Sequence, residues 1–215
     1  MATKKSILEK LSEPLKISDI DFRIQSISTS GWATILPYKD ARVDMNRLDE
    51  VCGLDWQNKY ELIDGQLFCS IGVKVDNEWV WRTDVGVESQ SEKTKGRASD
   101  SFKRAGFRFG IGRELYDYPR IFLQLKGAND LTNEKDKPEF KVKVLQGGKK
   151  IGTSGWGLKL DKWTWDIDFD KNNKVKRILG KDEKGVLRFD SNIDFNSLPK
   201  SNNQTQQTHP KQTPP

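Results

Sequence analysis

Residues 56–85, WQNKYELIDGQLFCSIGVKVDNEWVWRTDV, consist of three stretches in which apolar and polar residues alternate. Asp64-Gly65 separates the first two stretches and Asp76-Asn77 separates the last two. Asp-Gly favours a two-residue hairpin, because both central positions of that turn need positive φ. The pattern therefore predicts a three-stranded antiparallel meander whose middle strand turns one apolar face to a single side. That face consists of Leu67, Cys69, Ile71, Val73 and Val75.

The apolar face of the meander needs a cover, and residues 93–109 are expected to provide it as a helix. Four apolar residues recur there at helical spacing and fall on one side: Ala98, Phe102, Ala105 and Phe109. Meander and helix together form a β-β-β-α unit. We therefore expect an α+β fold whose core is an antiparallel three-stranded meander packed on a long basic helix.

Further elements are expected before the meander. Residues 20–27 follow a mostly period-two apolar pattern, and residues 32–36 offer a second strand. Apolar residues within 41–52 then share one helical face, and Gly53 follows as a C-terminal stop. Residues 3–12 fit a short amphipathic helix, which we interpret as a docking segment.

A β-rich region, residues 121–190, follows the long helix, but its fold does not emerge from the pattern. Trp163 and Trp165 share a strand face there; we expect core packing, with base stacking as the alternative. The last residues are rich in Asn, Gln, Thr and Pro, so burial cannot offset the entropy of ordering them and we expect a disordered tail. The expected division of the chain is 1–19, 20–120, 121–190 and 191–215.

The helix expected at 93–109 also carries a basic stripe. At about 100° per residue, five polar residues lie within about 40° of one line, roughly 110° from the apolar stripe: Lys93, Arg97, Ser101, Arg104 and Arg108. Asp100 and Lys103 lie on the remaining flank, so no acid neutralises the stripe along its own ridge, and Arg113 adds charge beyond it. Three nearby glycines let another backbone approach closely: Gly106, Gly110 and Gly112. An ordinary solvated face is the alternative interpretation.

Residues 99–119, SDSFKRAGFRFGIGRELYDYP, resemble the signature helix of the Rad fifty-two and Rad twenty-two family of single-strand annealing proteins. The family's Asp, Lys-Arg-Ala and Phe-Gly positions are matched by Asp100, Lys103-Arg104-Ala105 and Phe109-Gly110. VGVES in the meander and RVDMNRLDEVCGLDWQ upstream resemble the same family in the same order, over roughly residues 20–120. The ending GIGRELYDYP is most similar to bacterial and phage members.

The resemblance implies a β-β-β-α core for DNA binding and oligomerisation, joined into rings that hold single-stranded DNA in a basic groove. Carried over by position, the groove residues fall on Arg42, Lys103 and Arg104. Eukaryotic members place another basic residue where Phe107 stands here; either Arg108 takes over its phosphate contact or Phe107 stacks a base. The family's Tyr before a Gly-Trp-like pair is also missing, since Leu54 or Asp55 occupies its place.

The charge of the chain agrees with such a partner. Lys and Arg number 37 against 31 Asp and Glu, and the formal net charge of +6 favours a polyanion. No apolar run approaches the roughly 20 residues of a membrane span, and the N-terminus lacks a signal-peptide core. We therefore expect no membrane partner and a cytoplasmic location, in the bacterial host if a phage encodes the chain.

Residues for catalysis or metal binding are sparse. The two cysteines lack CxxC spacing, and the one histidine, His209, lies in the polar tail. Alternating acids in 166–170 resemble a calcium loop, yet Lys171 stands at the position of its Gly and Arg177 at that of its closing Glu. Alternating Asp on the wet face of a strand is the account we adopt. No GxxxxGK[ST] loop is present, so we expect no cofactor and no enzyme activity.

The prediction is a homo-oligomer, expected to be a ring, that binds single-stranded DNA and anneals complementary strands without ATP in recombination and repair. The alternatives are a metal-dependent nuclease of the same pathway and a passive single-strand binder. The tail either contacts a single-strand-binding protein or keeps the assembly soluble, and the sequence does not give the ring size. The expected DNA-binding residues are Arg42, Lys93, Arg97, Lys103, Arg104, Phe107, Arg108 and Arg113.

Overall fold

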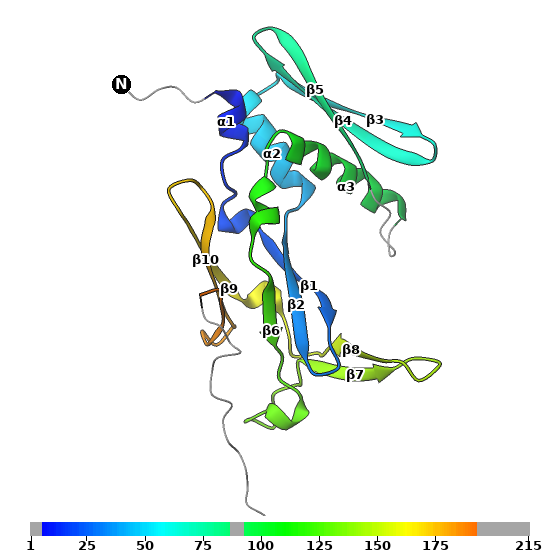
Figure 1. The fold of residues 1–215 in the computed structure, drawn as a ribbon, viewed down its shortest axis with the longest axis vertical. Helices are drawn as coiled ribbons and strands as arrows, with labels where there is room; N and C mark the ends of the chain where they lie inside the picture. The colour runs from blue at the N-terminus through cyan, green and yellow to red at the C-terminus, as the bar shows by residue number, and fades with distance from the viewer. Residues whose placement is uncertain (1–5, 87–92, 193–215) are drawn as a thin grey trace, which may run out of the picture.

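The computed structural model describes residues 6–86 and 93–192 (Figure 1). The helices are α1 (Ile7–Leu11), α2 (Ala41–Cys52) and α3 (Lys93–Arg108), with 3₁₀ turns η1 (Ile17–Asp19), η2 (Arg113–Asp117), η3 (Ala128–Asp130) and η4 (Leu160–Lys162). The strands are β1 (Asp21–Ile27), β2 (Trp32–Tyr38), β3 (Trp56–Ile63), β4 (Gln66–Val75), β5 (Glu78–Val85), β6 (Ile121–Gln124), β7 (Phe140–Val144), β8 (Lys150–Ser154), β9 (Thr164–Phe169), β10 (Val175–Lys181) and β11 (Leu187–Asp190). This mixture of helices and antiparallel sheets confirms the expected α+β class.

The meander forms as predicted, with strand order β3-β4-β5. Asp64 and Gly65 have φ of 50° and 74°, and Asp76 and Asn77 have φ of 49° and 72°, as two-residue hairpins require. The middle strand buries its inward face against α3. The side chains that meet there are Cys69, Ile71 and Val73 from β4 and Phe102, Ala105 and Phe109 from α3, all buried.

The N-terminal segment completes this first core. Helix α1 is shorter than the expected 3–12, because it ends at Leu11, and residues 1–5 lie outside the described part of the chain. Leu11 and Leu15 are buried in the same cluster as Leu48 of α2. Helix α1 packs on α2, so this segment is docked on the protein's own core.

A second core lies between a five-stranded sheet, ordered β6-β2-β1-β8-β7, and the three-stranded sheet β11-β10-β9 (Figure 1). Trp163 and Trp165 are buried in it, which confirms core packing, and Trp165 stacks on Phe22 at 4.0 Å between ring centroids. Strands β6 to β8 extend the sheet that β1 and β2 begin. The expected boundary between residues 120 and 121 therefore separates strands that belong to one sheet. The predicted tail falls almost entirely on residues 193–215, outside the described residues.

A buried lysine just after β2 links α2 to the segment that follows α3. The Nζ of Lys39, just after β2, donates to Oδ1 of Asp44 in α2 at 2.6 Å and to the carbonyl of Ile111 after α3. Both side chains are almost fully buried. A Cβ at Gly106 of α3 would collide with Oδ1 of Asp44, so glycine there allows the carboxylate to reach Lys39. Burial raises the pKa of Asp44 to about 6 and lowers the pKa of Lys39.

Replacing Phe102 by Ala is expected to lower the free energy of unfolding by about 3 to 5 kcal/mol, because it empties an aromatic site between α3 and the meander. Urea denaturation followed by circular dichroism measures the loss. Arg104→Gln on the neighbouring, partly exposed side is the matched control and should cost about 1 kcal/mol or less. Equal losses in both variants would contradict the assignment of the two helix faces.

The Lys39–Asp44 pair can be tested with a double-mutant cycle. Lys39→Met leaves a buried carboxylate without its cation and should cost about 3 to 5 kcal/mol near neutral pH. The cost should shrink as pH falls, because a carboxyl whose pKa is raised by burial takes up a proton more readily in the folded chain than in the unfolded one. With Asp44→Asn added, the double variant should lose about 0.5 to 3 kcal/mol less than the sum of the single losses. Strict additivity would mean that the pair is not coupled.

Candidate nucleic-acid interface

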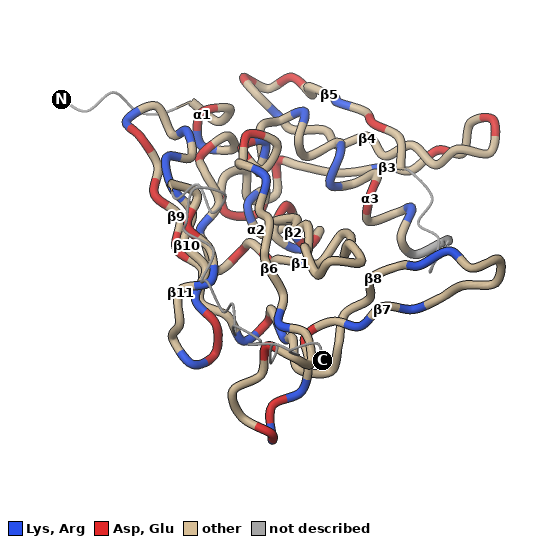
Figure 2. Tube along the Cα trace, turned by 60° about the horizontal axis from the view of Figure 1, so that its bottom comes forward, with Lys and Arg blue, Asp and Glu red and all other residues tan. Residues whose placement is uncertain are grey.

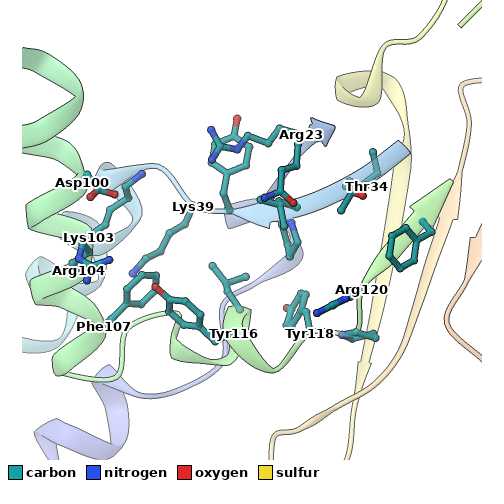
Figure 3. A pocket seen from close by; sticks show the side chains of 18 residues that line it. Arg23, Thr34, Lys39, Asp100, Lys103, Arg104, Phe107, Tyr116, Tyr118 and Arg120 are labelled. Atoms are coloured by element: carbon teal, nitrogen blue, oxygen red, sulfur yellow. The ribbon is translucent and has the colours of Figure 1, made fainter. Parts of the chain in front are cut away.

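A groove of about 670 Å³ lies between α3 and the face of β1 and β2 that turns away from the second core. Helix α3 contributes four residues at i, i+3, i+4 and i+7: Asp100, Lys103, Arg104 and Phe107. Strands β1 and β2 form the opposite wall, and the segment from η2 to β6 closes the end (Figure 3). Three segments far apart in the sequence therefore meet at one open site.

Positive charge dominates this groove. Arg23 from β1, Lys103 and Arg104 from α3, and Arg120 before β6 all line it, and among the described residues Asp100 is the one acid in the lining. Lys39 also lies at its floor, but its charge is already paired with Asp44. The side chains of Arg23 and Arg120 approach from the side opposite α3 (Figure 3). A chain of phosphates lying in the groove would thus meet cations on both walls.

Aromatic rings lie among these cations. The rings of Phe107 and Tyr116 meet edge to face, 5.0 Å apart, and Nζ of Lys39 lies 4.2 Å from the centre of the Phe107 ring. Tyr116 is 69% exposed. Phe107 thus lines the groove, whereas Phe102 and Phe109 of the same helix are buried in the core. Base stacking by Phe107 stays a prediction, because its half-buried ring lines the groove.

A smaller pocket of about 280 Å³ continues beyond Phe107 and Tyr116, and its other lining residues are Asp84, Arg104, Arg108 and Arg113. Asp84 of β5 accepts hydrogen bonds from Nε of Arg104 at 3.4 Å and Nε of Arg108 at 2.9 Å. Although burial opposes it, hydrogen bonds from the Val85 N–H and from Arg108 keep the pKa of Asp84 below its ordinary value. The basic stripe, expected to be free of acids along its ridge, is therefore partly paired from a neighbouring strand.

The eight residues predicted to bind DNA do not share one surface. Lys103, Arg104 and Phe107 line the groove, and Arg108 lines only the smaller pocket. Arg113 also lines that pocket, but its guanidinium donates to the carbonyls of Phe107 and Arg108 and so closes the end of α3. The helical wheel placed Lys103 on a flank away from the stripe; in the fold that flank faces the groove.

Of the remaining three predicted residues, Arg42 and Arg97 are not among the residues that line the groove. Arg42 is highly exposed and pairs with Asp40 at 2.8 Å. Hydrogen bonds from Arg42 lower the pKa of Asp40, and the charge of Lys103 adds to the shift. Arg97 donates to the carbonyl of Gly65 in the first hairpin turn. Helix α3 begins at Lys93, whose side chain lies outside the described part of the structure.

The three glycines within and after α3 permit close approach, as the sequence indicated, and the segments that approach them belong to this chain. A Cβ at Gly106 would meet Asp44, one at Gly110 would meet Ser12, and the space beside Gly112 is filled by Leu15 and Lys39. The close approach that these glycines permit is made by the protein's own chain.

The sequence pattern did not identify three residues that line the groove: Arg23, Arg120 and Tyr116. Arg23 stands between Phe22 and Ile24, so strand alternation would have pointed it away from the second core. That outer face becomes a wall of the groove only because the fold places α3 on the opposite side of the same groove. Arg120 and Tyr116 follow α3 in an irregular segment and carry no comparable pattern.

The acidic stretch near β9 is accounted for by local structure. Asp166 and Asp168 are exposed on the strand, and Asp170 accepts hydrogen bonds from the backbone N–H groups of Asn172 and Lys174 in the following turn. Within residues 6–86 and 93–192, no three His, Cys, Asp or Glu side chains gather as metal ligands. Over the same residues, no helix has the length and apolar character to cross a membrane.

No family model matches the chain, and no solved structure matches it significantly. The likeness to the Rad fifty-two family therefore stays a resemblance. Two curated relatives do match, both named single-stranded DNA-binding protein DdrA. The protein of Deinococcus radiodurans is 34% identical over 122 residues, 49% of this chain and 59% of the relative. The protein of Deinococcus deserti is 31% identical over 140 residues, 58% of this chain and 68% of the relative.

The chain thus spans only part of each relative: 59% of the length of the first and 68% of the length of the second. The second match nevertheless extends over more than two thirds of a protein that is 31% identical. On this likeness, the chain belongs to the family of the single-stranded DNA-binding protein DdrA.

Proposed function

We propose that this chain binds single-stranded DNA in the groove between α3 and β1–β2 and anneals complementary strands without nucleotide hydrolysis, in recombination and repair. The observation that carries the proposal is the convergence of cations from three separate segments, Arg23, Lys103–Arg104 and Arg120, around one open groove. The names of the two relatives, single-stranded DNA-binding proteins, support the same ligand.

The chemistry of the groove suits sequence-independent binding. Lysine and arginine neutralise phosphates, which carry no sequence information, while base edges are left free to find a complement. The exposed ring of Tyr116, which meets Phe107 edge to face, can stack any base, since every base has a π-face. Neither contact needs a hydrolytic centre or a nucleotide cofactor.

Assembly into a homo-oligomeric ring is part of the proposal. Among the described residues, no further strand pairs with the two edges of the sheet β3-β4-β5, and such edges are commonly protected by pairing or by covering. Its outer face also carries large apolar side chains in solvent, among them Trp79 and Trp81. Lateral assembly of identical subunits would cover both features.

The function can be tested by mixing two complementary labelled oligonucleotides with the full chain, without ATP and with or without Mg²⁺. Pairing should be faster with protein under both conditions, and light scattering should return a multiple of the 24.7 kDa chain mass. Strand binding without faster pairing would indicate a passive binder, and degradation that needs Mg²⁺ would indicate a nuclease. A monomeric mass with and without DNA would contradict the ring.

Replacing Arg104 by Gln should weaken binding of all sequences alike and make the slope of log K against log salt shallower by about 0.7, the loss of one phosphate contact on a single strand. Filter binding of labelled oligothymidine at several salt concentrations measures the slope. Lys176→Gln, an exposed lysine on β10, removes the same charge away from the groove and should leave the slope unchanged. An unchanged slope in a folded, oligomeric Arg104→Gln variant would place the DNA elsewhere.

A further inference from the structure

The hairpin formed by β7 and β8 projects from the body of the molecule as an arm (Figure 1). It joins the rest of the five-stranded sheet at a single residue pair, Ile27 of β1 with Gly152 of β8. A Cβ at Gly152 would collide with the carbonyl oxygen of Ser28, so glycine allows the two strands to cross this closely. Most of the hairpin is consequently exposed to solvent on both faces.

The two faces of the hairpin differ in character, because successive strand residues point to opposite sides. Phe140, Val142 and Val144 lie on one face, and Phe140 packs against the second core. Lys141 and Lys143 lie on the other face. The lysine face is therefore turned away from the second core.

The hairpin is strongly cationic. Lys141, Lys143, Lys149 and Lys150 lie in or beside its strands, and no Asp or Glu occurs from residue 140 to residue 160. Within the described part of the chain, none of these four lysines forms an ion pair. Positive charge runs along both strands of the arm (Figure 2). Four unpaired cations on one arm are complementary to a polyanion.

A tryptophan stands beside the lysine face. Trp156, two residues after β8, is 65% exposed, and Nζ of Lys141 lies 4.3 Å from the centre of its ring. The other two tryptophans of this C-terminal region, Trp163 and Trp165, are buried. An exposed indole next to an ammonium group offers a stacking surface for a base and a charge for its phosphate.

The lysine face and the groove belong to the same side of one sheet. Arg23 and Phe122 line the groove, and they alternate along β1 and β6 with Ile24 and Ile121, which pack in the second core. Along β7, Phe140 packs against the second core, and the next residue, Lys141, points to the other face of the sheet. The face of the five-stranded sheet that turns away from the second core thus carries cations at both ends.

We propose that the lysine face of the β7–β8 hairpin, together with Trp156, is a second contact for single-stranded nucleic acid. It takes the phosphates and one base of the segment that leaves the groove. The proposal rests on the proposed function of the groove and extends it to residues 140–156. A second copy of the chain is the other occupant considered, but the groove and hairpin share one face and one sign of charge, which favours a single polyanionic ligand.

The test uses the full chain and a series of oligothymidines of increasing length. Affinity for the unmodified chain should rise with length until both contacts are occupied. The double variant Lys141→Gln/Lys143→Gln should reach its plateau at a shorter length, and for long strands its slope of log K against log salt should be shallower by about 1.4, two phosphate contacts. Lys174→Gln/Lys176→Gln removes the same charge from exposed positions in and just before β10, outside the hairpin and the groove lining, and should keep the unmodified plateau length and slope.

Trp156 is tested separately. Trp156→Ala should weaken binding of long strands about tenfold and leave short strands unaffected, whereas Trp156→Tyr keeps a stacking ring and should restore most of the affinity. Circular dichroism and light scattering check that each variant keeps its fold and mass; because these side chains are exposed, the unmodified values are expected.

The outcomes separate this inference from the proposed function. If the unmodified chain fails to bind oligothymidine, or Arg104→Gln changes nothing, the groove proposal fails. If Arg104→Gln makes the slope of log K against log salt shallower, but the Lys141/Lys143 variant has the same slope and plateau length as its control, only the hairpin inference is overturned. A drop in assembly mass confined to the hairpin variants would also overturn it, because the arm would then contact another copy.

Discussion

The buried ion pair between Lys39 and Asp44 holds together the three segments on which the groove depends. Lys39 follows β2, Asp44 lies in α2, and the carbonyl of Ile111 that Lys39 also binds follows α3. An unpaired charge at this depth would be costly, so the three segments are constrained to one arrangement. The missing side chain at Gly106 is part of the same constraint, since it lets α3 lie directly over the carboxylate.

The Lys39–Asp44 pair also determines which residues form the walls of the groove. With α3 packed on α2 and on the meander, its Lys103, Arg104 and Phe107 line the groove opposite the outer side of β1 and β2, where Arg23 stands. Asp84 orients Arg104 and Arg108 from the β5 side without removing the excess of positive charge. A preorganised arginine pays less entropy when it meets a phosphate than a freely moving one.

Much of the local structure was predictable because it depends on short-range rules. Asp64-Gly65 and Asp76-Asn77 specify hairpins through their tolerance of positive φ, and the strand pattern between them fixes which residues face α3. The burial of Trp163 and Trp165 also followed from their strand face. The pairing of β6 and β8 with a sheet begun about a hundred residues earlier did not, because such long-range pairings leave no local signal.

By itself, the sequence determined the β-β-β-α unit, the surplus of basic residues and the helix that carries Lys103, Arg104 and Phe107. The tertiary structure decided which of those basic residues share a groove. Helical periodicity ranks residues around a single axis, so it grouped Arg97 and Arg108 with Arg104 and left Lys103 aside. Which face of the helix lines the groove depends on what lies opposite it, namely β1 and β2 with Arg23. The packing around the buried Lys39–Asp44 pair sets this arrangement, and no pattern in the sequence marks those two residues as buried.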